Sequence, residues 1–202
     1  MNPYARRLVL AYSARSRERK AALIVKLIQQ TATRRVLLVG AMASGTEPNE
    51  GIVERLVAAA AVEVVSIILY DPGQQPWPYL MADGCHMPFA DQSFDLVVSN
   101  AVVEHVGNEA DQLAFVAEHV RVGRDWVITT PNRWFPVESH TSTIFLHWRS
   151  AWRERRPEFS RLLSRREFCS LLPPGSSLVG RAWQATFLAS SSPVRAKDGR
   201  PG

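Results

Sequence analysis

Short runs of apolar residues alternate along the chain with segments in which apolar and charged residues recur at helical spacing. Four runs are rich in Val, Ile and Leu and are too short for amphipathic helices. They lie at residues 36–40, 64–69, 94–99 and 126–130. A continuous apolar run of this length is typical of a strand that is buried on both faces. We therefore predict a mostly parallel sheet at the centre of the fold.

Three segments between these runs have a helical period. Apolar residues recur every three or four positions in 16–30, 50–61 and 111–122, with charged residues between them. A fourth helix is predicted to run from Ser164 to about Leu172, because Ser164 and the Glu three positions later form a capping-box pattern. Strand, glycine loop and helix thus follow one another as in an α/β fold.

Three weaker strands complete the predicted sheet. A short one lies at 79–82, and the link before it, 72–78, is too short and too rich in proline for a crossover helix. Two more lie near 178–182 and 185–188. We expect seven strands in total, with an extended link in place of one helix.

The expected organisation is one domain with additions. Residues 1–33 are predicted to be an N-terminal helical cap, and residues 34–189 the main domain, with an insertion at 131–156 that has many aromatics and no clean period. The tail 190–202, rich in Ser, Pro, Gly and charge, is predicted to be disordered.

Composition adds limits on compartment and partners. No apolar run is long enough to span a bilayer and no secretory leader is evident, so we expect a cytoplasmic protein.

The net charge of +5 is uneven, with arginines crowded in 6–35 and 149–166. That asymmetry suits an anionic partner such as nucleic acid, although solvated helix faces explain it equally simply. Cys85 and Cys169 form no CxxC pair and are interpreted as packed thiols.

Candidate ligand-binding residues lie at the carboxyl ends of four predicted strands. These residues, Gly40, Asp71, Asp83 and Asn100, stand where open α/β sheets bind ligands. The loop that opens at Gly40 also approaches a phosphate-binding loop, but the required lysine is missing and Thr46 is followed by Glu47.

The stretch from Asp83 to Val106 carries the most specific pattern. It follows D-x-x-x-[LM]-P-F-x-D-x-S-F-D-x-[VA], and it resembles the type 11 group of class I S-adenosylmethionine-dependent methyltransferases. The positions in register are Pro88, Phe89, Ser93, Phe94 and Asp95. The resemblance implies an α/β, three-layer Rossmann-like methyltransferase fold with a mostly parallel seven-stranded sheet, and S-adenosyl-L-methionine as cofactor.

The same resemblance implies a set of cofactor-binding residues. Asp71 is expected to accept hydrogen bonds from the ribose hydroxyls and Asp83 from the adenine amino group. The backbone of the loop after the first predicted strand and of the turns is expected to meet the rest of the cofactor; the residues concerned are Gly40, Ala41, Gly45, Gly84 and Asn100. Two positions depart from the family pattern, since Leu38 replaces a frequent acid and Met42 a frequent glycine.

The segment 129–141, which reads TTPNRWFPVESHT, also resembles a run found in some members of this group. On that basis Asn132, Trp134 and Phe135 are expected to contact the methyl acceptor. The candidates for a catalytic base are His140, Glu138 and His105, of which His140 is preferred because its unperturbed pKa lies near neutrality. Each of these residues also suits a purely structural role.

The resulting hypothesis is methyl transfer to a hydroxyl of a small molecule or of a glycan- or lipid-linked acceptor. Two alternatives stay open. The arginine clusters suit an RNA methyltransferase, and the departures at Leu38 and Met42 suit an inactive, methyltransferase-like interaction module.

Overall fold

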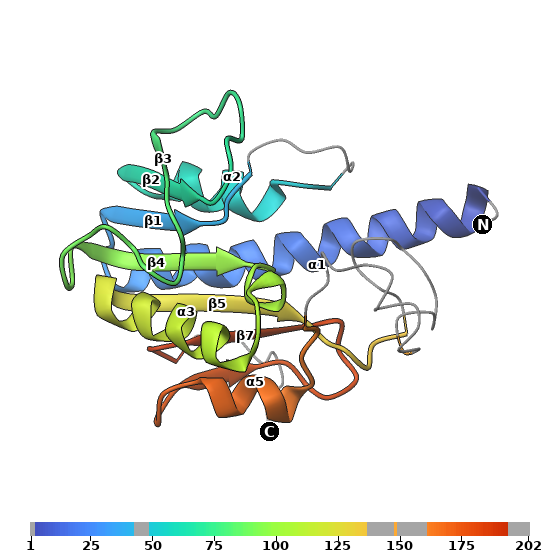
Figure 1. Ribbon diagram of the computed structural model, residues 1–202. Coiled ribbons are helices and arrows are strands. Elements are labelled where there is room, and N and C mark those ends of the chain that lie inside the picture. Colours follow the sequence, from blue (N-terminus) through green and yellow to red (C-terminus); the bar gives the residue numbers. More distant parts are fainter. Residues whose placement is uncertain (1–2, 43–48, 137–147, 149–160, 194–202) are drawn as a thin grey trace, which may run out of the picture.

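A seven-stranded sheet organises the chain in the computed structural model, which describes residues 3–42, 49–136, 148 and 161–193 (Figure 1). The strand order is β3-β2-β1-β4-β5-β7-β6, and β7 alone runs antiparallel to its neighbours. The strands are β1 (Arg35–Val39), β2 (Glu63–Ile68), β3 (Tyr79–Met81), β4 (Phe94–Asn100), β5 (Gly123–Pro131), β6 (Ser177–Val179) and β7 (Thr186–Ser190). The predicted mostly parallel, seven-stranded α/β sheet is confirmed.

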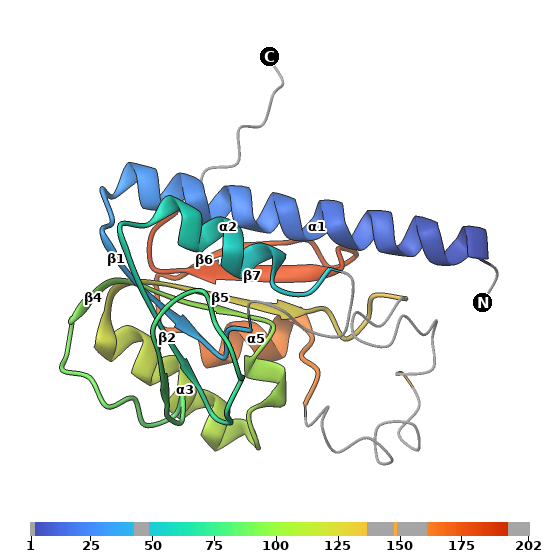
Figure 2. The ribbon, with the colours of Figure 1, turned by 90° about the horizontal axis from the view of Figure 1, so that it is seen from above.

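Helices cover both faces of this sheet. The long helix α1 (Pro3–Gln30) and α2 (Ile52–Ala60) lie on one face, and α3 (Glu109–Val122) and α5 (Arg165–Leu171) lie on the other (Figures 1 and 2). Because successive strand residues point to opposite faces, Leu37 packs in the core under α3 and Leu38 packs under α1 and α2. The fold therefore has three layers with two apolar cores.

The element bounds differ from the sequence prediction at several ends. Helix α1 starts at Pro3 rather than at residue 16, and a proline suits the first turn because its missing N–H has no helical partner there. Strand β5 includes Pro131, whose neighbour across the antiparallel pair is Thr186. Strand β7 continues to the buried Ser190, so the predicted tail begins after that residue.

Several local predictions are confirmed. The link before β3 contains no helix. Both capping-box hydrogen bonds at the start of α5 are present, between Ser164 and Glu167. The division of the chain at residue 33 stays a prediction, and α1 buries Ala21, Ile24 and Leu27 in the core shared with β1 and β4.

Within the described residues the two cysteines are free thiols and no helix has the length and apolarity of a membrane span. Cys85 is half-buried, and burial together with the adjacent Asp83 raises the pKa of its thiol to about 12. Cys169 is exposed on α5, so the expectation of a packed thiol is wrong for that residue. The compartment stays a prediction.

A buried histidine in α3 makes the stability of the fold depend on pH. His119 is fully buried, its Nδ1 lies 2.8 Å from the Phe115 carbonyl oxygen, and burial lowers its pKa to about 4. The unfolded chain takes up a proton near pH 6.5 whereas the folded chain does not, so folding stability is lost as pH falls from about 6.5 to about 4.

We expect this histidine alone to cost about 3 kcal/mol over that window. The measurement is urea unfolding of the wild type and of His119→Gln at pH 7 and pH 4.5. The wild type is expected to lose more stability than the variant. Equal losses in the two proteins would show that His119 titrates normally in the folded state.

Candidate active site

Three loops converge at the carboxyl ends of β1, β3 and β4. Gly40 has φ +68°, and a Cβ at this position would lie 2.8 Å from a methyl group of Val102 in the loop after β4. A Cβ on Gly84, in the turn after β3, would lie 2.7 Å from the Phe115 ring and 3.1 Å from the Val39 side chain. Glycine at 40 and 84 thus allows the three loops to meet at the point where the strand order reverses.

Two exposed carboxylates follow β2 and β3. Asp71 Oδ1 accepts a hydrogen bond from the Gly73 N–H at 2.9 Å and from the Tyr79 hydroxyl at 3.3 Å. Asp83 Oδ1 accepts from the Cys85 N–H at 2.8 Å. One oxygen of each carboxylate therefore closes a turn, and the Cys85 N–H is used within that turn. Both acids sit at neighbouring strand ends, because β2 and β3 pair in parallel.

Asn100, the last residue of β4, is a junction between both helices of one face and the sheet. Its Oδ1 accepts hydrogen bonds from Lys20 Nζ at 2.9 Å and from the Thr129 hydroxyl at 2.8 Å. Its Nδ2 donates to Glu54 Oε1 at 2.9 Å. The side chain is thus engaged inside the protein, and the backbone is what this residue offers to a ligand. The next residue, Ala101, has φ +57°, a conformation that an L side chain rarely adopts and that is frequent at functional sites.

A buried carboxylate lies beside an exposed histidine in the 3-10 turn η1 (Val103–His105). Glu104 is fully buried, and its Oε2 accepts a hydrogen bond from the Thr130 hydroxyl at 3.1 Å. His105 Nε2 lies 4.0 Å from Glu104 Oε1. This pair stands at the ends of β4 and β5, where the acceptor is expected.

The residues that follow β5 divide into a buried junction and an exposed aromatic surface. Asn132 is buried; its Nδ2 donates to the carbonyls of Ala182 and Gln184, and its Oδ1 accepts from the Trp134 N–H. Its side chain therefore holds the connection between β6 and β7, and the contact of Asn132 with the acceptor stays a prediction. Phe135 stacks on Tyr12 of α1 with ring centroids 5.9 Å apart.

Trp134 and Trp148 stay exposed next to this junction. Their side chains are 56% and 40% exposed, and their rings meet edge to face with centroids 6.4 Å apart. The guanidinium of Arg133 lies 5.2 Å from the Trp134 ring centroid. Together they form an exposed aromatic and partly cationic surface at the end of β5.

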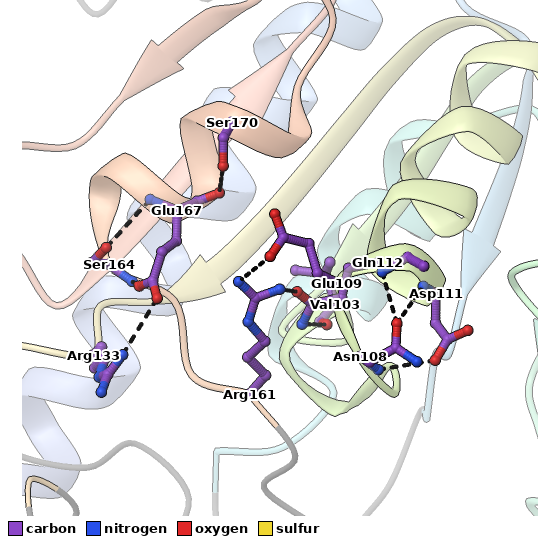
Figure 3. Close-up of polar contacts among 11 residues, drawn as sticks. Val103, Asn108, Glu109, Asp111, Gln112, Arg133, Arg161, Ser164, Glu167 and Ser170 are labelled. Carbon is purple, nitrogen blue, oxygen red and sulfur yellow. Dashed lines mark hydrogen bonds and ion pairs between the residues drawn. The ribbon is translucent and has the colours of Figure 1, made fainter.

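Two arginines hold the chain on either side of the segment 134–160 (Figure 3). Arg133 contacts Glu167 of α5 at 3.4 Å, and Arg161 donates to Gln112 and Glu109 of α3 at 3.1 and 2.9 Å. The N–H of Arg161 also donates to the Glu104 carbonyl, and that of Arg133 to the Leu163 carbonyl. Arg161 is therefore tied to the turn that carries Glu104.

The sequence reasoning missed Lys20, Glu54 and Arg161. Each lies in a segment whose charges look like an ordinary solvated face, and only the fold brings them to the strand ends. Three predicted residues, Gly45, Glu138 and His140, lie outside the described residues and keep their status as predictions.

The two departures from the family pattern have different surroundings. Leu38 is buried in the core that β1 shares with α1 and α2, where an apolar side chain packs. Met42 is exposed, and its neighbour Ala41 is buried. At position 38 a leucine is what the local packing requires.

The features at the strand ends fit an adenosine-containing cofactor. Two exposed carboxylates at neighbouring strand ends match the donors of a sugar diol and an amino group, and Gly40 leaves the backbone of the first loop approachable. Asp71, Asp83 and the backbone of Gly40 are the groups that would hold it. The chemistry that S-adenosylmethionine supplies when bound is an activated methyl group.

The comparisons with known proteins agree with this geometry. The sequence profile of a family described as a methyltransferase domain matches residues 50–125. No curated protein matches the sequence significantly. Among solved structures, an S-adenosylmethionine-dependent methyltransferase from Archaeoglobus fulgidus superposes with a TM-score of 0.59 at 12% identity, over 86% of this chain and 93% of that one.

Two other solved structures show the same fold. A methyltransferase from Aquifex aeolicus that depends on the same cofactor superposes with a TM-score of 0.50 at 16% identity, over 82% of this chain and 86% of that one. A chain of the Haloferax volcanii complex that contains the Trm112 methyltransferase activator superposes with a TM-score of 0.53 at 13% identity, over 90% and 94%. Residues 50–125 are thus similar to the methyltransferase-domain family, and the chain as a whole has the fold of S-adenosylmethionine-dependent methyltransferases.

Proposed function

We propose that this enzyme transfers the methyl group of S-adenosylmethionine to a hydroxyl of a small molecule or of a glycan- or lipid-linked acceptor. The observation that carries the proposal is the exposed pair Trp134 and Trp148 at the end of β5. Aromatic faces of this kind suit an acceptor with a flat or apolar surface, and the polar groups beside them orient it.

The proposed cofactor contacts follow the strand order. Asp83 after β3 recognises the adenine amino group, with Gly84 beside the ring, and Asp71 after β2 accepts from the ribose hydroxyls. The first loop, Gly40 and Ala41 together with Gly45, and the backbone of Asn100 then line the amino-acid end. A cofactor with base and sugar at β3 and β2 extends toward β1 and β4, because these strands are the next in the sheet.

The chain contributes alignment and a base. In-line methyl transfer depends on holding the acceptor oxygen opposite the leaving sulfur, and positioning of this kind is worth about 7 to 11 kcal/mol. Among the residues that the structure describes, His105 is suited to remove the hydroxyl proton, and it lies beside the buried carboxylate of Glu104. Glu138 and His140 are proposed for the same task or for orienting the acceptor, and Trp134 and Phe135 for contacting it.

The experiment that tests this proposal has two stages. Calorimetry with S-adenosylmethionine and S-adenosylhomocysteine measures cofactor binding. Transfer of labelled methyl groups is then measured against hydroxylated small molecules, free and lipid-linked glycans, and RNA. Transfer to a hydroxylated small molecule or glycan is the expected result. Absence of binding at millimolar ligand would favour the inactive interaction module.

RNA is a second candidate because two arginine–tryptophan pairs are exposed. Arg133 lies over Trp134, and Arg181 lies 5.5 Å from the ring centroid of Trp183, which is also exposed. Such pairs stack on unpaired bases while the cation meets phosphate. Binding of single-stranded RNA that weakens steeply with salt, together with methyl transfer to it, would favour this alternative.

A change at Asp71 tests the cofactor assignment. Asn at this position keeps the acceptor oxygen for the Gly73 N–H but removes the charge and one acceptor. We expect Asp71→Asn to weaken S-adenosylhomocysteine binding about tenfold or more, since hydrogen bonds to charged groups contribute about 1.5 to 3 kcal/mol. The measurement is calorimetry. The control is Glu63→Gln at the opposite end of β2, where no loss is expected; an unchanged affinity in Asp71→Asn would remove this residue from the site.

A further inference from the structure

Lys20 of α1 brings a partly buried positive charge to the end of β4. Its Nζ donates to Asn100 Oδ1 at 2.9 Å, and burial, with Arg17 as a second cause, lowers its pKa to about 8. The nearby carboxylates of Glu54 and Glu104 counteract that shift. Partial burial thus destabilises the ammonium, and the two carboxylates offset only part of that cost.

The groups around Lys20 form hydrogen bonds with one another and leave N–H donors of Lys20 unused. Glu54 is bonded to Asn100 Nδ2 and Glu104 to the Thr130 hydroxyl, and Asn100 Oδ1 is shared with Thr129. The contacts described for Lys20 use one of its three N–H donors. A partly buried ammonium with unused donors carries a desolvation cost, and an anionic ligand would offset that cost.

Helix α1 also extends past the strand ends (Figure 1). Beyond Lys20 toward the N-terminus, Tyr12 stacks on Phe135 after β5, and the Leu10 carbonyl accepts from Asn49 Nδ2 in the segment before α2. The helix thus forms one wall beside the ends of β1, β4 and β5. Among the described contacts of α1, the hydrogen bond from Lys20 is the one that reaches the side chain of Asn100, the last residue of β4.

We propose that the ammonium of Lys20 binds the carboxylate at the amino-acid end of S-adenosylmethionine. The inference rests on the proposed orientation of the cofactor, in which base and sugar lie at β3 and β2 and the amino-acid end reaches β1 and β4. That end carries a carboxylate, and Lys20 supplies donors at the β4 terminus. Lys20 would then determine which end groups the pocket accepts.

The test compares two ligands that share adenosine and a thioether. S-adenosylhomocysteine carries the carboxylate, whereas 5′-methylthioadenosine lacks the amino-acid end. Lys20→Met is expected to weaken binding of S-adenosylhomocysteine about tenfold to hundredfold and to leave binding of 5′-methylthioadenosine within about twofold. Lys26→Met on the same helix is the control and is expected to change neither affinity.

The outcomes separate this inference from the cofactor assignment. An equal loss for both ligands would assign Lys20 to the fold alone, and no loss for either would also overturn the inference. If neither ligand binds the wild type, the proposed function itself fails. Lys20→Gln, which keeps a donor for Asn100, must show the same selective loss; binding of 5′-methylthioadenosine reports that either variant is folded.

The pH dependence of binding supplies a further readout. The ammonium faces Arg17 of α1, Glu54 of α2 and Glu104 of η1. Since the protonated form is needed to hold a carboxylate, S-adenosylhomocysteine affinity of the wild type is expected to fall as pH rises above about 8, by up to about tenfold per pH unit. The decline is expected to be smaller in Lys20→Met, and identical profiles would contradict the inference.

Discussion

Replacing His105 with Gln is expected to lower kcat by about 10²- to 10⁴-fold, the usual contribution of a general base. His105 stands at the end of β4, and its Nε2 lies 4.0 Å from the buried carboxylate of Glu104. The turn that carries both residues is tied down by Arg161, so the pair is held in place before substrate binds.

The measurement is single-turnover methyl transfer to the acceptor that the substrate panel identifies. Affinity for S-adenosylhomocysteine is expected to stay within about twofold of the wild type, because a base that acts only in the transition state contributes little to ground-state binding. Glu104→Gln, which preserves the shape and the Thr130 contact, is expected to give a smaller loss. A decrease in kcat below about threefold in His105→Gln would remove this residue from proton transfer and leave that task to another group.

Replacing Phe115 with Ala is expected to destabilise the fold by about 3 to 5 kcal/mol. Its ring is fully buried in α3, lies 4.4 Å from the His119 ring by centroid distance, and fills the space directly beneath Gly84. The cost combines the lost transfer free energy of the ring with the cavity left below the turn after β3. Because that turn carries Asp83, cofactor affinity is expected to fall as well.

Urea unfolding at pH 7 measures the stability change, and Leu113→Ala on the exposed side of the same helix is the matched control. That control removes a partly solvated side chain, and we expect it to cost less than about 1 kcal/mol. A loss below about 1 kcal/mol in Phe115→Ala would mean that the neighbouring core closes over the cavity, and that the turn does not rest on this ring.

The positions of the strands were predictable because a buried strand needs a short continuous apolar run and little else. The helix-free link before β3 followed from its prolines, and the start of α5 from the capping pair Ser164 and Glu167, since both are local effects. The length of α1 was not predictable from periodicity, because the regular apolar spacing begins only in its second half.

The motif residues show the limit of pattern reading. Asp95 belongs to the run that carries the family resemblance, yet its Oδ2 accepts from the backbone N–H groups of Arg34 and Arg35 at the start of β1, and these bonds lower its pKa. It therefore secures the amino end of the sheet, away from the ligand. Asn132 likewise satisfies carbonyls of the β6–β7 connection.

The sequence by itself determined the fold class and the family resemblance, and it placed one acid near the end of β2 and another near the end of β3, because each of these depends on residues close together in the chain. The tertiary structure alone decided that Lys20 meets Asn100, 80 positions later, and that Glu104 is buried under Thr130. Such encounters depend on how helices pack on a sheet, and packing brings together side chains whose separation along the chain carries no signal. The charges that surround the site were therefore visible only in three dimensions.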